Sequence, residues 1–451
     1  MVAFKFGVVR KFRCGAVCLL FVAASAPVGC SSSAQPSGSS RTGTISVTPK
    51  ASLADQPVHI VVRGLAPGQQ VTVGLTSTDA KDVPWSSKAV FRSNSSGVVD
   101  LGTASAISGS YTGVNPMGLI EAMQPVTAQS VEYIWSLRFG LSFQVTVTEN
   151  GTTVATGAFT RALSAAGVTH TDETIAGTGF YGQFWQPPAG TAPHPAVLEF
   201  GGSEGGLISL LPGAGLASAG YPTLDIAYFG EPGLPSSLKD IPLEYFEKAL
   251  QWLARQPGVL PHEIYVSGGS RGSEAALLLG VYYPNLVHGV IASSPGDMLL
   301  CSYPGCAGAA WTLDGKPLPY TRSLDTDPGS NPAAVIPVQK IRGPVLFDCG
   351  TDDNVWPSCD HAQYSYNLAA GTRYPRVLYR YTGAGHQDNL FPYEPVSSEF
   401  AASLFEYQGD TALANDDADA RLWPELLGFL ADPSAHTGMF TVDATPPPLS
   451  S

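Results

Sequence analysis

The residues of this chain best suited to covalent chemistry lie in its second half, and Ser270 comes first among them. Ser270 is the centre of a Gly-X-Ser-X-Gly pentapeptide, residues 268–272, which follows an apolar run at 264–266 and precedes a helix-forming segment at 273–279. A sharp turn from strand to helix raises a serine hydroxyl above the end of a sheet and places it at the positive end of a helix. The pattern therefore predicts that Ser270 acts as a nucleophile.

A serine hydroxyl needs a base that takes its proton, and His386 is the predicted base. It follows the small residues Gly383-Ala384-Gly385 after a strand-like run. Small residues at this point allow the loop to bring the imidazole over Ser270. His361, in the helix-like segment after the candidate acids, is the alternative base.

A carboxylate must hold the base in the correct tautomer. Asp352 and Asp353 both follow a buried-looking strand at 344–350, and the order serine, acid, histidine is that of the α/β-hydrolases. We select Asp352 as the acid because Val355, three positions later, is the usual packing residue after it. Asp353 stays open as the alternative.

Backbone amides are the predicted oxyanion hole. One is the N–H of Arg271, next after the nucleophile, and the second is expected in the Gly-rich loop 201–206, for which we select Ser203. This loop lacks the Lys-Ser/Thr of a phosphate-binding loop and the spacing of a dinucleotide site, so nucleotide binding is not expected there. The chemistry requires no metal and no organic cofactor.

Two kinds of pattern divide the chain into elements that would position these residues. Short alternating segments with turns between them fill residues 44–162 and predict a β-sandwich. Strand-like and helix-like segments alternate over residues 170–435 and predict an α/β domain with a mostly parallel sheet and helices on both faces. The turn-rich stretch 301–338 is the predicted cap over the substrate, and residues 436–451 are the predicted tail.

The first 43 residues predict export. A basic region precedes a short apolar core at residues 14–26, too short to span a membrane, and small residues lead to Cys30 and a Ser-rich tether at 31–43. Residues 1–30 therefore predict a lipoprotein signal with a lipid anchor at Cys30, and the alternative is a plain secretory signal. Loss of the four cations in this segment would change the net charge from −13 to −17, which argues against electrostatic binding of nucleic acid or anionic lipid.

Four cysteines remain in the rest of the chain. They form two close pairs, and in an oxidising compartment the spacing favours disulfides Cys301–Cys306 and Cys349–Cys359, although three pairings are possible. The chain has no C-x-x-C pair, so a structural zinc site is not expected.

Many pieces of the chain resemble the acyl-CoA thioesterase and bile acid-CoA:amino acid N-acyltransferase (BAAT) family. In the first domain the resemblance rests on residues 53–58, 64–68, 85–87 and 109–119, and in the second on the GGSEGGL loop at 201–207, 227–229, 243–246, 269–274, 352–358 and 383–386. The resemblance implies an immunoglobulin-like first domain, an α/β-hydrolase second domain, and fatty-acyl thioester chemistry by Ser270, Asp352 and His386. Serine rather than cysteine as the nucleophile favours hydrolysis.

The residues thus predict an exported serine hydrolase that cleaves fatty-acyl thioesters or related esters. Two alternatives stay open. The same acyl-enzyme would serve an acyltransferase that passes the acyl group to an amine or alcohol, and a third hypothesis is a non-catalytic exported binding protein on a hydrolase scaffold.

Overall fold

The computed structural model describes residues 43–127, 132–208, 210–386, 391–395, 412–443, 445–447 and 449. The predicted signal, Cys30 and nearly all of the tether lie outside them. Residues from Arg41 onward form one compact unit, which contains two sets of sheets built from successive parts of the chain.

The first part is all β apart from one short helix. Its two sheets have the strand orders β1-β3-β6 and β2-β10-β9-β4-β5-β7, and β8 pairs with β5. Side chains of β4 alternate between exposed and buried, as expected for a sheet with one face in a core. The elements are β1 (Thr44–Thr48), β2 (Ala51–Leu53), β3 (His59–Arg63), β4 (Gln70–Thr78), β5 (Pro84–Arg92), β6 (Val99–Asp100), β7 (Ser108–Gly109), α1 (Gly118–Glu121), β8 (Gln124–Pro125), β9 (Leu141–Glu149) and β10 (Thr152–Ala162).

The second part is built on a nine-stranded sheet with the order β11-β12-β14-β13-β16-β17-β20-β21-β22. The pairs β11–β12 and β12–β14 are antiparallel and all others are parallel. This is the α/β fold that the sequence predicts. The strands are β11 (Thr169–Glu173), β12 (Tyr181–Gln186), β13 (His194–Phe200), β14 (Thr223–Ala227), β16 (Val259–Gly269), β17 (Gly289–Ser293), β20 (Val345–Gly350), β21 (Arg376–Thr382) and β22 (Gly438–Asp443).

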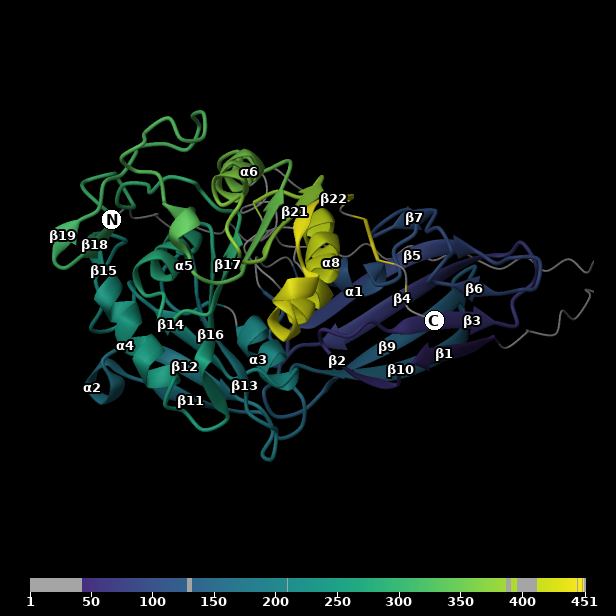
Figure 1. The fold of residues 1–451 in the computed structure, drawn as a ribbon. Coiled ribbons are helices and arrows are strands. Elements are labelled where there is room, and N and C mark those ends of the chain that lie inside the picture. Colours follow the sequence, from purple (N-terminus) through teal and green to yellow (C-terminus); the bar gives the residue numbers. More distant parts are fainter. Residues whose placement is uncertain are drawn as a thin grey trace, which may run out of the picture. The chain divides into compact units, whose positions relative to one another are not determined.

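Helices cover both faces of this sheet (Figure 1). Neighbouring strand residues Val197 and Leu198 belong to two different apolar clusters, because successive side chains of a strand point to opposite faces. Helices α3 (Leu210–Ser218) and α8 (Ala412–Ala431) contribute to the first cluster, and α4 (Leu243–Leu253), α5 (Arg271–Tyr282) and α6 (Ser358–Leu368) to the second. The remaining short helices are α2 (Ile175–Thr178), η1 (Val338–Lys340) and η2 (Pro433–Ala435).

The predicted tail is partly wrong. Residues 438–443 form β22, which pairs in parallel with β21 from Val377 to Thr382 and completes the sheet. Only a few residues follow it. Residues 438–443 are few and partly polar, so their sequence gave little indication of a strand. A strand at the edge of a sheet needs apolar side chains on one face only.

The predicted cap contributes two of the three strands of a small second sheet. Strands β15 (Ile241–Pro242), β18 (Trp311–Leu313) and β19 (Lys316–Pro317) pair in that order. The backbone between residues 298 and 335 is further joined by single bridges, among them Leu300 with Thr321 and Cys301 with Ala309. The stretch is therefore ordered by backbone pairing although it lacks sequence periodicity.

Arg161, at the end of β10, joins the sandwich to the second part. Its side chain is fully buried and donates to the carbonyl oxygens of Ala54, Gln56 and, at 3.2 Å, Tyr393. Burial lowers the pKa of Arg161 to about 10, and the nearby Asp55 carboxylate opposes this effect. The guanidinium remains charged at neutral pH and holds two backbone segments, at residues 54–56 and at Tyr393, that are distant from each other in the chain.

Candidate active site

Ser270 lies between β16 and α5 in the turn that the pentapeptide predicts. Its φ of 53° and ψ of −121° are rare for a residue with a side chain, and the residue is 5% exposed. The next residue, Arg271, begins α5, so the hydroxyl lies at the amino end of a 12-residue helix. The backbone N–H of Ser270 donates to the carbonyl of Ser293 at 3.0 Å, which fixes the turn against β17.

The glycines of the pentapeptide permit two close backbone approaches. A Cβ on Gly268 would lie 2.5 Å from the carbonyl oxygen of Gly272, and a Cβ on Gly272 would lie 2.4 Å from the carbonyl oxygen of Gly201. Real Cβ atoms do not approach backbone atoms this closely. A side chain at either position would therefore force the backbone of the turn to shift, and the turn brings the Gly-rich loop against the nucleophile.

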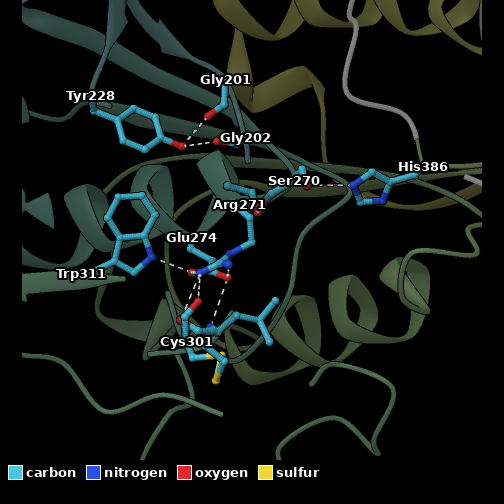
Figure 2. Close-up of polar contacts among 12 residues, drawn as sticks. Gly201, Gly202, Tyr228, Ser270, Arg271, Glu274, Cys301, Trp311 and His386 are labelled. Carbon is cyan, nitrogen blue, oxygen red and sulfur yellow. Dashed lines mark hydrogen bonds and ion pairs between the residues drawn. A yellow bond between two sulfur atoms is a disulfide. The ribbon is translucent and has the colours of Figure 1, made fainter. Parts of the chain in front are cut away.

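His386 joins Ser270 to a carboxylate. Its Nε2 lies 2.8 Å from Ser270 Oγ and its Nδ1 lies 2.8 Å from Asp353 Oδ2 (Figure 2 shows the Ser270 contact). An ionised carboxylate only accepts hydrogen bonds, so Nδ1 carries the proton and Nε2 is left to accept the proton of the serine. The side chains of His386 and Asp353 are 3% and 1% exposed, which keeps water from competing for these bonds.

The selection of Asp352 as partner of His386 is wrong, because Asp353 occupies that position. Asp353 Oδ1 accepts the backbone N–H groups of Val355 and Trp356 at 2.9 and 3.3 Å, and its Oδ2 is thereby left facing the imidazole. Asp352 is exposed, and its Oδ1 lies 2.9 Å from the Thr351 hydroxyl. Two adjacent residues of a turn point in different directions, so only the second reaches the histidine.

The alternative base, His361, belongs to a different site. Its Nδ1 contacts Asp297 Oδ1 and its Nε2 lies 2.8 Å from the carbonyl oxygen of Leu324, while both ionisable side chains are fully buried. Burial opposes protonation, but the bonds to Asp297 and Leu324 outweigh it and raise the pKa of His361. Both ring nitrogens face acceptors, which favours the protonated form of the imidazole, and the contacts tie α6 to the cap.

The Gly-rich loop after β13 lies directly beside the nucleophile. A Cβ placed on Gly202 would be 2.9 Å from the Cβ of Ser270. The hydroxyl of Tyr228 lies 2.8 and 2.7 Å from the carbonyl oxygens of Gly201 and Gly202 and holds these carbonyls away from the serine (Figure 2). The N–H of Gly202 donates to Glu204 Oε1 at 2.7 Å. Ser203, the donor selected from the sequence, lies between Gly202 and Glu204 and stays a prediction.

A buried network joins the first turn of α5 to the cap (Figure 2). Arg271 Nε donates to Glu274 Oε1 at 2.8 Å, and its Nη2 donates to the carbonyl oxygens of Leu300 and Cys301 at 3.0 and 2.9 Å. Trp311 Nε1 donates to Glu274 Oε2 at 2.6 Å. Burial raises the pKa of Glu274, and the contacts with Arg271 and Trp311 oppose that rise. We call these contacts the Arg271 clamp.

Two disulfides frame the site, with the pairing that the spacing favours. Cys301–Cys306 closes the cap loop that the Arg271 clamp holds. Cys349–Cys359 joins the end of β20 to the first turn of α6 and therefore encloses the segment that carries Asp353. Each disulfide thus restrains a loop that contributes to the surroundings of Ser270.

Several residues of the site had no predicted role. Tyr228, Glu274 and Trp311 were not selected, although the first two lie in pieces that carry the family resemblance. Trp356 packs edge-on against the ring of His386, with the ring centroids 4.6 Å apart. It belongs to a small buried apolar cluster with Met298, Leu324 and Ala334, the last two of which lie in the cap.

In the described part of the chain, no three His, Cys, Asp or Glu side chains are grouped so that they could hold a metal ion. Every helix within it is too short or too polar to cross a bilayer.

Comparison with known proteins identifies two family models along the chain. The acyl-CoA thioester hydrolase/BAAT N-terminal region matches residues 55–174, and the BAAT/acyl-CoA thioester hydrolase C-terminal model matches residues 241–301 and 315–435. Together they match more than half of the sequence, and they include Ser270, Asp353 and His386.

Curated relatives match over almost their whole length. Acyl-coenzyme A amino acid N-acyltransferase 2 of Rattus norvegicus is 29% identical over 87% of this chain and 98% of its own length. Peroxisomal succinyl-coenzyme A thioesterase of Mus musculus is 28% identical over 86% of this chain and 96% of its own length. Among solved structures, a dienelactone hydrolase-like promiscuous phosphotriesterase from metagenomic libraries is 14% identical, covering 59% of this chain and 99% of its own, with a TM-score of 0.39.

Proposed function

Because the chain belongs to the acyl-CoA thioester hydrolase/BAAT family, we propose that it is a serine hydrolase of acyl thioesters or related acyl esters. The observation that carries this proposal is the continuous set of hydrogen bonds from Ser270 through His386 to Asp353. A nucleophile, a base and a carboxylate in this order are the parts that acyl transfer to serine requires.

In the first step, Ser270 Oγ forms a bond to the acyl carbon while His386 Nε2 takes the hydroxyl proton. The tetrahedral intermediate collapses, the bond from the acyl carbon to the leaving sulfur or oxygen breaks, and His386 returns its proton to the leaving group. The negative charge of Asp353 stabilises the imidazolium that forms between these two transfers. The product of this step is an acyl ester of Ser270 and a free thiol or alcohol.

Backbone N–H groups stabilise the charge on the carbonyl oxygen during both transfers. Arg271 is the first residue of α5, and the N–H groups in the first turn of a helix lack an intrahelical acceptor. The second donor is proposed to be the N–H of Ser203. The N–H of Gly202, one residue earlier, already donates to Glu204 Oε1, which supports this choice.

In the second step, water attacks the acyl ester. His386 takes one proton of the water, the hydroxyl oxygen bonds to the acyl carbon, and the proton passes to Ser270 Oγ as the ester bond breaks. The carboxylic acid leaves and the free serine is restored.

A labelling experiment tests the assignment. A fluorophosphonate probe should label the wild-type protein and should fail to label Ser270→Ala and His386→Ala, because the probe reacts with an activated serine. Hydrolysis of a p-nitrophenyl acyl ester should disappear in the same two variants, whereas His361→Gln should retain labelling if it folds. Labelling or turnover that persists in Ser270→Ala would refute the proposed nucleophile.

We also propose that the protein is exported and anchored through Cys30. Two disulfides in the described part support export, because disulfides persist in oxidising compartments. Incorporation of a labelled fatty acid into the wild type but not into Cys30→Ser, with loss of the variant from the membrane fraction, is the expected result. A plain secretory signal would instead leave the wild type unlabelled.

A further inference from the structure

A cavity lies at the edge of the nine-stranded sheet opposite to Ser270. Its volume is about 530 Å³, and its walls come from the starts of β13 and β16, the segments before β14 and β17, and the end of α8. Glu263, which lines the cavity, and Ser270 are seven residues apart along β16 and the turn that follows it. A strand rises about 3.3 Å per residue, so the cavity is about 20 Å from the nucleophile. It is therefore separate from the triad.

Two buried tyrosine hydroxyls at this cavity have no hydrogen-bond partner among the described residues. Tyr265 is 1% exposed, Tyr221 is 6% exposed, and both side chains line the cavity. Burial raises the pKa of Tyr265, and the negative charge of Glu263 raises it further, so this hydroxyl stays protonated and lies near that carboxylate. Because polar groups of buried side chains are normally hydrogen-bonded, these two hydroxyls are available to a polar group of a ligand.

Packed rings fix the tyrosines in place. The ring of His288 is edge-on to that of Tyr265, with the centroids 5.2 Å apart, and the ring of His194 is edge-on to that of Tyr221 at 5.4 Å. A Cβ on Gly289 would lie 2.5 Å from Tyr265 Cε1, so the glycine leaves the space that the ring fills. A wall ordered in advance lowers the entropy that binding a ligand costs.

The fixed charge around the cavity is negative. Glu263 lines it directly, and Asp432 lies near enough to Tyr265 to raise the pKa of that hydroxyl. Helix α8 ends at Ala431, which also lines the cavity, and the C-terminus of a helix carries a partial negative charge. Among the residues that line the cavity, all of which the structure describes, none is a lysine or an arginine. A cation would therefore be attracted to this cavity, and an anion would not.

We propose that this cavity binds an organic ammonium with an apolar body. The ammonium group donates to the Glu263 carboxylate and to the hydroxyl oxygens of Tyr221 and Tyr265. The apolar body packs against the aromatic rings and against proline and leucine side chains of the wall, as in small-molecule sites with a few polar groups in an apolar lining. The site is independent of the proposed function, because it shares no residue with the triad.

Titration calorimetry with three probes of one shape tests the proposal. Phenethylamine carries a positive charge, 2-phenylethanol is neutral, and 3-phenylpropionate is negative. In low-salt buffer at pH 8 the wild-type protein should bind phenethylamine saturably and about tenfold more tightly than 2-phenylethanol, because only the ammonium forms a charge-assisted bond with Glu263. The carboxylate probe should bind more weakly than the alcohol.

Two variants identify the groups that hold the amine. Glu263→Gln should weaken binding of phenethylamine about tenfold and leave binding of 2-phenylethanol unchanged. Tyr265→Phe should weaken binding of the amine about threefold, as expected for one hydrogen bond between a neutral and a charged group. Glu247→Gln is the matched control, since Glu247 is also half-buried, lies on α4 and does not line the cavity. It should bind the amine as the wild type does.

Several outcomes would overturn the inference. These are equal affinity for the amine and the alcohol, tighter binding of the carboxylate probe, and an affinity for the amine that Glu263→Gln leaves unchanged. Absence of saturable binding of phenethylamine up to about 10 mM would also overturn it. Ser270→Ala should bind the amine normally, and loss of binding in that variant would instead place the amine at the hydrolase site.

Discussion

His386 Nδ1 lies 2.8 Å from Asp353 Oδ2, and the neighbouring Asp352 directs its carboxylate to the hydroxyl of Thr351 instead. The difference follows from the turn after β20, in which two backbone N–H groups hold Asp353 Oδ1 and orient the other oxygen inward. The two aspartates are therefore a natural pair for testing which carboxylate assists the base.

Asp353→Asn should lower kcat by about 10³- to 10⁴-fold, because an amide at this position favours the wrong tautomer of His386. Asp352→Asn should change kcat by less than about threefold, since its carboxylate is exposed and screened by water. Steady-state kinetics with a p-nitrophenyl ester measures both. Equal losses in the two variants would contradict the geometry of the turn.

Gly272→Ala should destabilise the protein by about 1–3 kcal/mol, because the added methyl group would meet the carbonyl oxygen of Gly201. The strain falls on the loop beside Ser270, so fluorophosphonate labelling should slow as well. Urea unfolding and labelling rates provide the two measurements. Gly177→Ala is the control, since its Cβ would meet only the Thr174 hydroxyl, at 3.4 Å.

The buried carboxyl of Glu199 should make the stability of the protein depend on pH. Burial raises its pKa to about 8 from the ordinary 4.5. Between these two values the unfolded chain releases a proton that the folded protein keeps, so the free energy of unfolding falls as the pH rises from about 4.5 to 8. Glu199→Gln should make this decline shallower, as measured by urea unfolding at several pH values. Glu247→Gln, on the outer side of α4, should run parallel to the wild type.

Loss of the Cys349–Cys359 disulfide should lower stability by about 3 kcal/mol, as expected for a loop of this length. The double variant to alanine should also lower kcat, because the enclosed segment carries Asp353. In the Asp353→Asn background the same change should have little further effect on kcat, since the carboxylate that it positions is gone. Additive losses of kcat would show that the disulfide acts on another part of the site.

The nucleophile turn, the histidine loop and the disulfide pairing could be read from the sequence because each depends on local pattern. Glycine at positions 268 and 272 indicates that backbone segments approach each other closely around Ser270. The short spacing within each cysteine pair favours the two disulfides that form. The identity of the acid could not be read in this way. Asp352 and Asp353 are neighbours of the same type, and only the path of the turn separates them.

The contacts of Arg271 could not be predicted either, because they depend on where the cap returns in space. Its partners Leu300 and Cys301 are about thirty residues away and offer only backbone carbonyls, which carry no sequence signal. Likewise, β22 could not be predicted from its own sequence, because it becomes a strand by pairing with the edge of β21. Sequence patterns thus indicated the site and the order of its parts, and tertiary contacts decided their partners.

Arg161 has a consequence for any attempt to study the halves of this protein separately. In a fragment that begins after β10, the Tyr393 carbonyl would lose the hydrogen bond from Arg161. In the isolated sandwich, the guanidinium of Arg161 would lose the Tyr393 carbonyl as an acceptor. Limited proteolysis between residues 163 and 168 should therefore yield a nicked but still associated pair of fragments. We therefore expect a fragment that lacks the sandwich to be less stable than the whole chain, so that engineering should keep both parts together.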